Sequence, residues 1–309
     1  METIELKQSV TFKNILLATD FSEVSGKAVP YAAAIASRYG SKIYLVHVIP
    51  PEPRMPVPME HLPADLDYGR LNAELRMKAF LKGDPLGNIP HEVLLEQGPI
   101  WDVLSELIQR DEIDLLVLGT HGRGGLKKAI LGSVAEELFR LASCPVLTVG
   151  PAVPAEPEGA KEFRRILFAT DFGPASLNAL QHAISLVTES NARLMLLHVV
   201  PPVPVLDVGP YWYAGTDLVE KQKTARARYL GRLKELTPRD VNLPSDPEFL
   251  VDFDFTPDAI VKIAADSQAD LIVMGVNQSA SARASAHLPW ATAHEVVCHA
   301  KCPVLTVRS

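Results

Sequence analysis

Two short segments place glycines and a hydroxyl group at a spacing that suits phosphate binding. Residues 119–122 read Gly-Thr-His-Gly, and after nine further residues 132–133 read Gly-Ser. The unbroken apolar run 115–118 predicts that the first segment follows a strand buried on both faces. Ser133, with Glu136 three residues later, predicts a helix that begins with a capping box. A glycine loop between a parallel strand and a helix N-terminus offers N–H groups to an anion, and we expect a phosphate.

By itself this spacing also fits glycines that only form turns. Three further segments narrow the interpretation: 15–22 read Ile-Leu-Leu-Ala-Thr-Asp-Phe-Ser, 47–48 read His-Val, and 144–149 read Cys-Pro-Val-Leu-Thr-Val. Together with the glycine segments they resemble the ATP-binding signature of the universal stress protein family. The resemblance spans the whole first half of the chain, and it implies a nucleotide-dependent regulator of the stress response.

The resemblance implies that the first half binds ATP, with Mg²⁺ or Mn²⁺ held through the phosphates and not by a protein cage. In such a site Val48 would contact adenine with its side chain or its backbone. The expected nucleotide contacts are Ala18, Thr19, Asp20, Val48, Leu118, Gly119, His121, Gly122, Arg123, Gly132, Ser133 and Val134. No residue is assigned to catalysis or to a metal, because the sequence contains no P-loop, no Rossmann glycine fingerprint and no hydrolytic triad motif.

Some of these residues have a second interpretation. Asp20 would accept hydrogen bonds from ribose hydroxyls or from the edge of adenine, or else it caps the following helix. His121 would hydrogen-bond a phosphate, or it lies exposed in its loop. Arg123 would neutralise phosphate charge, whereas Lys127 and Lys128, which could do the same, are expected on a solvated helix face.

The composition is that of a globular protein of about two domains. The chain has 309 residues, 47% hydrophobic and 22% charged, so it can bury a large core. A net charge of −7 without a basic stripe argues against nucleic-acid binding, and no apolar run has the length of a membrane span. We therefore expect a cytoplasmic protein. Cys298 and Cys302, with His294 and His299, also suggest zinc, but their spacing better fits buried thiols where a helix runs into a strand.

The chain contains an internal repeat. Residues 12–21, FKNILLATDF, return as 163–172, FRRILFATDF, and CPVLTV closes both halves. We expect two universal stress protein domains, over 1–150 and 162–309, joined by a semi-rigid, proline-rich linker over 151–161. In single-domain relatives the last strands pair between subunits, so we expect a pseudo-dimer within the chain and a homodimer of chains.

Each half predicts an α/β domain in which strands and helices alternate. In the first half, the expected strands are one ending at 19–20 and those over 43–49, 92–95 and 115–118, and the expected helices are one ending at Gly40 and those over 66–81 and 101–109. Pro30 would mark the first turn of a helix or a kink. Continuous apolar strands predict a parallel, doubly wound sheet covered on both faces, and the resemblance implies five strands in the order 3-2-1-4-5. Asp20 and Gly119 should then line one cleft, where the winding reverses.

The second half keeps the scaffold but loses much of the glycine pattern. Residues 275–278 read Gly-Val-Asn-Gln, and counting back from the closing CPVLTV places Trp290 opposite Gly132. A tryptophan there would fill the phosphate space, and Asp171 alone would not hold a triphosphate. We expect a degenerate partner domain, with the binding of a smaller polar ligand by 277–279 as the alternative.

Two other functions compete with a nucleotide-dependent regulator. The first is an enzyme that hydrolyses ATP slowly or transfers a nucleotidyl group in the same cleft. The second is a dimeric scaffold that binds no nucleotide, against which the intact glycine set of the first half argues. The sequence implies an adenine nucleotide and a protein partner without distinguishing ATP from AMP or ADP and without identifying the partner.

Overall fold

The computed structural model describes residues 10–51, 68–120, 132–154, 162–202, 215–237, 241–276 and 289–308. They belong to two compact units, one within Thr11–Lys161 and one within Glu162–Ser309, which we call the first and the second domain. Val10 lies with the second unit, where its carbonyl oxygen accepts a hydrogen bond from Ser185 Oγ at 2.7 Å. None of the helices in the described ranges has both the length and the apolar character to cross a membrane.

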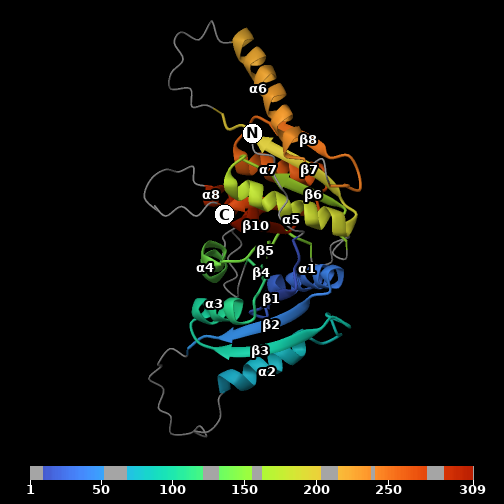
Figure 1. The fold of residues 1–309 in the computed structure, drawn as a ribbon. Helices are drawn as coiled ribbons and strands as arrows, with labels where there is room; N and C mark the ends of the chain where they lie inside the picture. Colours follow the sequence, from blue (N-terminus) through green and yellow to red (C-terminus); the bar gives the residue numbers. More distant parts are fainter. Residues whose placement is uncertain are drawn as a thin grey trace. The chain divides into compact units, whose positions relative to one another are not determined.

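The first domain alternates strands and helices along the chain (Figure 1). Its elements are β1 (Asn14–Ala18), α1 (Glu23–Tyr39), β2 (Lys42–Ile49), α2 (Tyr68–Phe80), β3 (His91–Gln97), α3 (Ile100–Arg110), β4 (Leu115–Gly119), α4 (Ser133–Leu141) and β5 (Val146–Val149). Neighbouring strands are parallel, in the order β3-β2-β1-β4-β5. The predicted doubly wound sheet is thus confirmed, and its winding reverses between β1 and β4.

The central strands β1 and β4 are apolar on both faces because helices cover both. Leu16 and Leu17 in β1, and Leu115 and Leu116 in β4, expose none of their surface, although successive side chains point to opposite faces. Right-handed crossovers place α1 and α2 on one face and α3 and α4, which pack against each other, on the other face. The central strands can therefore offer a ligand only their ends.

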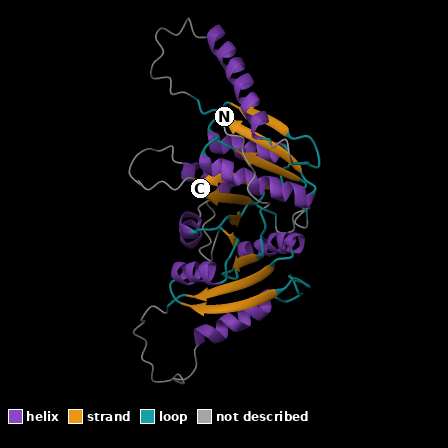
Figure 2. Cartoon of the chain, in the orientation of Figure 1, coloured by secondary structure: helices purple, strands orange, loops and turns teal. Residues whose placement is uncertain are grey.

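The second domain repeats this arrangement, as the colouring of helices and strands in Figure 2 shows. Its elements are β6 (Arg165–Ala169), α5 (Pro174–Ser190), β7 (Arg193–Val199), α6 (Gly215–Leu236), β8 (Glu248–Asp252), α7 (Thr256–Asp266), β9 (Leu271–Val276), α8 (Pro289–His299) and β10 (Val304–Arg308). Its strands are parallel, in the order β8-β7-β6-β9-β10. The internal repeat of the sequence is therefore a repeat of the fold.

Several boundaries of the first domain differ from the sequence prediction by one or two residues. The strand β1, for example, ends at Ala18 and not at 19–20. The strand expected over 92–95 extends over His91–Gln97. Its ends are polar and exposed, so the hydrophobic pattern of the sequence does not reveal them. The helix α1 begins at Glu23 after the N-cap Ser22, so Pro30 lies in the helix interior and not in its first turn. The helix ends as predicted at Gly40, whose φ of 65° is left-handed.

An aspartate at the amino end of the sheet joins the two central strands of each domain. Asp114 Oδ2 accepts hydrogen bonds from Lys13 N at 2.8 Å and from Asn14 N at 3.0 Å. Asp270 makes the same pair of bonds in the second domain, both at 2.8 Å. These bonds help to set the register of β1 against β4, and so the position of the strand ends at the opposite edge.

Gly119 is required by packing, whereas the glycine pattern suggested a contact with phosphate. The first turn of α1 crosses the end of β4 so closely that a Cβ on Gly119 would lie 2.8 Å from Ser25 N and from Val24 C. In the second domain a Cβ on Gly275 would lie 2.3 Å from Ala175 C. Backbone atoms at these distances leave no room for a methyl group. The glycine kept in both halves thus serves helix–strand packing, whether or not the domain binds a ligand.

Gly119→Ala should destabilise the first domain by about 1–3 kcal/mol, because the added methyl group can be accommodated only by moving the backbone of α1. Gly231→Ala is the control: Gly231 lies in α6 with nothing within 4 Å of an added Cβ. That change should stabilise its helix by roughly 0.5–1 kcal/mol. Urea unfolding measures both effects, and a Gly119→Ala variant as stable as the wild type would contradict this account of Gly119.

Candidate functional site

The carboxyl ends of β1 and β4 bring together two segments that are distant in the sequence. Ala18 pairs in register with Leu118, so Asp20 and Thr120, each two residues further on, follow neighbouring strands. Thr19 N also donates to Val46 O at 2.9 Å, which attaches the same end to β2. The Asp20 segment and the end of β4 are therefore neighbours at the point where the winding of the sheet reverses, which is where ligands bind in folds of this class.

Asp20 lies in a tight turn between β1 and α1. Its Oδ1 accepts a hydrogen bond from Ser22 N at 2.9 Å. Ser22 is the N-cap of α1, and its Oγ accepts a hydrogen bond from Ser25 N at 3.1 Å. The alternative prediction, that Asp20 caps the helix, is wrong because the cap lies two residues further on. The half-buried Asp20 carboxylate still lies at the N-terminus of a helix, where the helix dipole favours its negative charge.

The N-terminus of α4 is held at the end of β4. Gly132 N donates to Thr120 O at 2.8 Å, and Thr120 N donates to Val149 O at 3.0 Å. Gly132 is the N-cap, with φ −62° and ψ 146°, and the helix itself begins at Ser133. The expected helix start is right, but the expected capping box is wrong, because the extended cap conformation falls on the glycine. A glycine cap has no side-chain acceptor, so it leaves the amides of the first turn to other acceptors, such as an anion.

The remaining predicted contacts differ in burial. Val48 is 8% exposed, Leu118 3% and Thr19 7%, so these side chains belong to the core. Ala18, at the end of β1, and Val134, in the first turn of α4, are half-buried. Of Ser133 only the backbone is described. Outside the described residues lie His121, Gly122, Arg123, Lys127 and Lys128.

Sequence reasoning missed a cluster of side chains next to Asp20. The ring centroids of Phe21 and His47 lie 4.2 Å apart, and the guanidinium carbon of Arg76 lies 4.8 Å from the centre of the Phe21 ring. His47 Nδ1 forms a hydrogen bond with Thr19 O at 2.7 Å, which ties the ring to the end of β1. The signal was present in the sequence, because both halves keep Thr-Asp-Phe and His-Val.

The second domain builds the same turn with a different set of hydrogen bonds. Asp171 Oδ1 accepts hydrogen bonds from Gly173 N at 2.8 Å and from the hydroxyl group of Ser176. In the first domain the corresponding hydroxyl, that of Ser25, contacts Thr19 Oγ1 at 3.0 Å instead. The Asp171 carboxylate is thus engaged by a side chain of its own helix.

The junction of β9 and α8 also differs from that of β4 and α4. The buried Val276 stands where the first domain has Thr120, so a hydroxyl group is replaced by a methyl group. The helix α8 begins at Pro289, which has no N–H to offer to an anion. Trp290 follows as the second helical residue, and only its backbone is described. The residue that the sequence places opposite the cap Gly132 therefore lies inside the helix.

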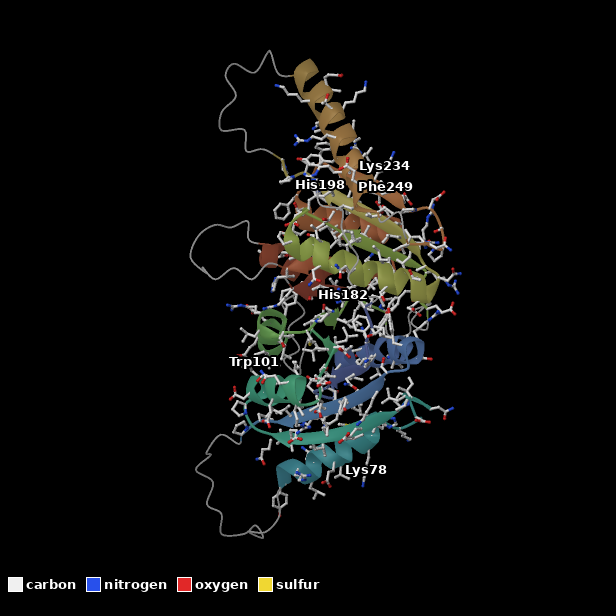
Figure 3. All side chains as sticks on the ribbon, viewed as in Figure 1. Lys78, Trp101, His182, His198, Lys234 and Phe249 are labelled. Carbon is white, nitrogen blue, oxygen red and sulfur yellow. The ribbon has the colours of Figure 1, made fainter. Side chains whose placement is uncertain are left out.

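Burial favours the neutral form of two histidines in the second domain, both labelled in Figure 3. Desolvation lowers the pKa of His182 on α5, and its hydrogen bond with Asn178 O at 3.1 Å opposes this shift. Desolvation is also the main cause that lowers the pKa of His198, at the end of β7. The charge of Arg232 lowers it further, whereas the hydrogen bond with Thr170 O raises it.

The cysteines have the character of core residues. Burial raises the pKa of Cys144 and of Cys302 to about 12, so neither is a reactive thiolate at neutral pH. Of the alternative zinc set, Cys298 is buried and His299 Nδ1 forms a hydrogen bond with Glu295 O at 2.9 Å. Within the described ranges, no three His, Cys, Asp or Glu side chains are grouped closely enough to hold a metal ion.

The comparisons with known proteins agree on one family. The profile of the universal stress protein family matches residues 11–150 and again 162–308. A universal stress protein of Mycolicibacterium smegmatis is 30% identical over 243 residues, 73% of this chain and 75% of that protein. Universal stress protein MJ0531 of Methanocaldococcus jannaschii is 33% identical over 141 residues, 45% of this chain and 82% of that protein. The crystal structure of a universal stress protein from Archaeoglobus fulgidus DSM 4304 shares the fold, with a TM-score of 0.61 at 20% identity over 96% of this chain and 98% of that chain.

The second domain should lose stability as the pH falls below about 6.5. Because the folded-state pKa values of His182 and His198 lie below the ordinary 6.5, the unfolded chain binds protons in acid that the folded chain does not. Their contribution is fully present above the unfolded pKa and is lost as the pH falls towards the folded pKa.

His182→Gln should reduce this pH dependence, because a neutral amide replaces the imidazole. The control is His91→Gln, a change of an exposed histidine on β3 of the first domain. Thermal unfolding between about pH 5 and pH 8 measures how steeply the stability of each variant changes with pH. If stability changes equally with pH in the wild type and in His182→Gln, then His182 does not contribute to the pH dependence.

Proposed function

The chain belongs to the universal stress protein family, and we propose that its first domain binds ATP whereas its second domain does not. The observation that carries this proposal is the junction of β4 and α4. There Gly132 N donates to Thr120 O, and this bond holds a helix N-terminus without a side-chain cap at the strand next to the Asp20 segment. A phosphate chain and a ribose need an anion-binding group and a hydroxyl acceptor close together, and these two segments supply both.

The phosphates would bind at the N-terminus of α4. The amides of its first turn, at Ser133 and Val134, and the positive end of the helix dipole suit an anion. His121, Gly122 and Arg123, which are assigned from the sequence alone, would complete the phosphate site. Mg²⁺ or Mn²⁺ would be held by phosphate oxygens, the hard ligands that these ions prefer.

The nucleoside would bind on the side of β1 and β2. The bond from Ser22 N orients the Asp20 carboxylate, and an ionised carboxylate accepts up to about four hydrogen bonds. A ribose hydroxyl can therefore donate to Asp20 without displacing Ser22 N. Val48 would contact adenine through its backbone or the small exposed part of its side chain, since it is 8% exposed.

Three differences support a second domain that does not bind ATP. The hydroxyl of Ser176 occupies one acceptor site of the Asp171 carboxylate, whereas the corresponding Ser25 of the first domain contacts Thr19 Oγ1. Val276 lacks the hydroxyl that Thr120 carries, and Pro289 removes an amide from the start of α8. Nucleotide-dependent signalling to a protein partner, dimer assembly and a cytoplasmic location stay predictions from the sequence.

To test this proposal, the purified protein is denatured before and after incubation with ATP and Mg²⁺. The released nucleotide is then identified and counted by chromatography and mass spectrometry. We expect about one ATP per chain.

Asp20→Asn should weaken ATP binding by about tenfold or more, because a hydrogen bond to a charged acceptor is lost while the amide oxygen can still accept from Ser22 N.

Asp171→Asn is the matched control and should leave the affinity of the chain for ATP unchanged. Two nucleotides per chain would contradict the silent second domain. No bound nucleotide under either condition would overturn the proposed function itself.

Gly122→Gln should abolish ATP binding, because it copies into the first domain the glutamine that the second domain has at Gln278. The reverse change, Gln278→Gly, should not create a second site, since Ser176 and Pro289 remain. Calorimetric titration with ATP measures both variants. An unaltered affinity in Gly122→Gln would remove the 119–122 segment from the phosphate site.

A further inference from the structure

The residue after Asp20 has a backbone conformation that is unusual for its type. Phe21 has a φ of 61°, in the left-handed region that bulky residues rarely occupy. Such a conformation persists only where the surroundings hold it, and it is found mainly at functional sites. Its position is important here, because this single residue turns the chain from the Asp20 segment into the N-terminus of α1.

Four neighbours hold Phe21 in this conformation. Its N–H donates to Thr19 Oγ1 at 3.0 Å. One side of the ring lies against His47 on β2, at a centroid distance of 4.2 Å, and the Phe80 ring lies at 5.8 Å. The guanidinium carbon of Arg76, on α2, lies 4.8 Å from the ring centre, within the range of a cation–π contact. We call Phe21, His47 and Arg76 the phenylalanine clamp.

The clamp is connected to Asp20 by hydrogen bonds as well as by the chain. Arg76 Nη2 donates to the Asp20 carbonyl oxygen at 3.5 Å. His47 Nδ1 bonds to Thr19 O, on the other side of Asp20 in the sequence. The backbone on both sides of Asp20 is thus fixed by β2 and α2, while its carboxylate orients Ser22. Arg76 is therefore one of the groups that hold both the left-handed turn and the backbone of Asp20.

The same arrangement occurs in the second domain. Phe172 has a φ of 62°, its ring lies 4.6 Å from that of His198, and the guanidinium carbon of Arg232 lies 3.9 Å from its ring centre. Arg232 lies on α6, a helix that differs from α2 in length and sequence. Two helices that differ elsewhere thus place an arginine on the same phenylalanine, which argues that the contact is specific.

We propose that Arg76 is a positioning residue of the nucleotide site. Through the phenylalanine clamp it holds Asp20 for the ribose, so the docking of α2 and the binding of ATP are thermodynamically coupled. This inference rests on the proposed function. Because coupling is reciprocal, ATP should also stabilise the packing of α2 on Phe21. The second domain, where Asp171 is engaged by Ser176, would keep its clamp as a purely structural feature.

Arg76→Gln tests the proposal, with ATP affinity measured by calorimetry at a temperature where every variant is folded. We expect about tenfold weaker binding, the size of a typical coupling between sites. Arg76→Lys should recover part of the loss, since an ammonium retains the cation–π contact but not the planar stacking of a guanidinium. Arg232→Gln, the equivalent change in the second domain, should leave ATP affinity unchanged.

A second control separates positioning from a general loss of stability. Ile108→Val truncates the core of the first domain in α3, at a side chain that is 5% exposed, and it should not weaken ATP binding. Hydrogen exchange gives the reciprocal readout: ATP should slow exchange of the α2 amides in the wild type, and Arg76→Gln should lose this protection.

The possible failures are distinguishable. If the wild type binds no nucleotide, the proposed function is overturned and this inference with it. If the wild type binds ATP and Arg76→Gln binds it equally tightly, or if Ile108→Val weakens binding as much as Arg76→Gln does, only the inference is overturned.

Discussion

The close approach of α1 to the end of β4 is the contact on which the candidate site depends. The backbone of the first turn of α1 lies directly over Gly119, and a Cβ there would come within 3 Å of Ser25 and Val24. This contact brings the cap Ser22, and therefore the Asp20 turn, to the strand that leads into the glycine segment. Gly275 makes the same contact in the second domain. The packing of each domain thus requires a glycine at this position, independently of ligand binding.

The two domains share one backbone frame around the end of the first strand. In both domains an aspartate follows the first strand, and a phenylalanine with positive φ turns the chain into a helix. Among the described residues, several differences lie where the strands end. Ser176 engages Asp171, Val276 removes a hydroxyl, and Pro289 removes an amide donor from the following helix. Both copies thus keep the packing glycine and the phenylalanine turn, whereas these groups at the strand ends differ.

The energy of the phenylalanine turn explains why several groups surround it. A left-handed conformation costs an ordinary residue about 1–2 kcal/mol. An aromatic pair such as that of Phe21 with His47 contributes about 0.5–1.5 kcal/mol, and a cation–π contact such as that with Arg76 about 0.5–1 kcal/mol. Two such contacts together are of the size needed to offset the cost, whereas one alone leaves the turn marginal. Because the cost of the left-handed turn and the energy of its contacts are nearly equal, the turn depends on the contact that Arg76 of α2 makes with Phe21.

The sequence by itself determined the tandem repeat, the parallel α/β fold of each half, the family and the pair of segments that meet at the switch point. All of these features follow from local hydrophobic patterns and from repeated sequence segments, which can be recognised without knowing any distant contact. Only the tertiary structure decided that Gly119 serves packing, that Gly132 and not Ser133 caps α4, and that Arg76 lies on Phe21. The reason is physical: those facts depend on how closely a crossover helix approaches a strand end, and such distances arise from packing between residues far apart in the chain.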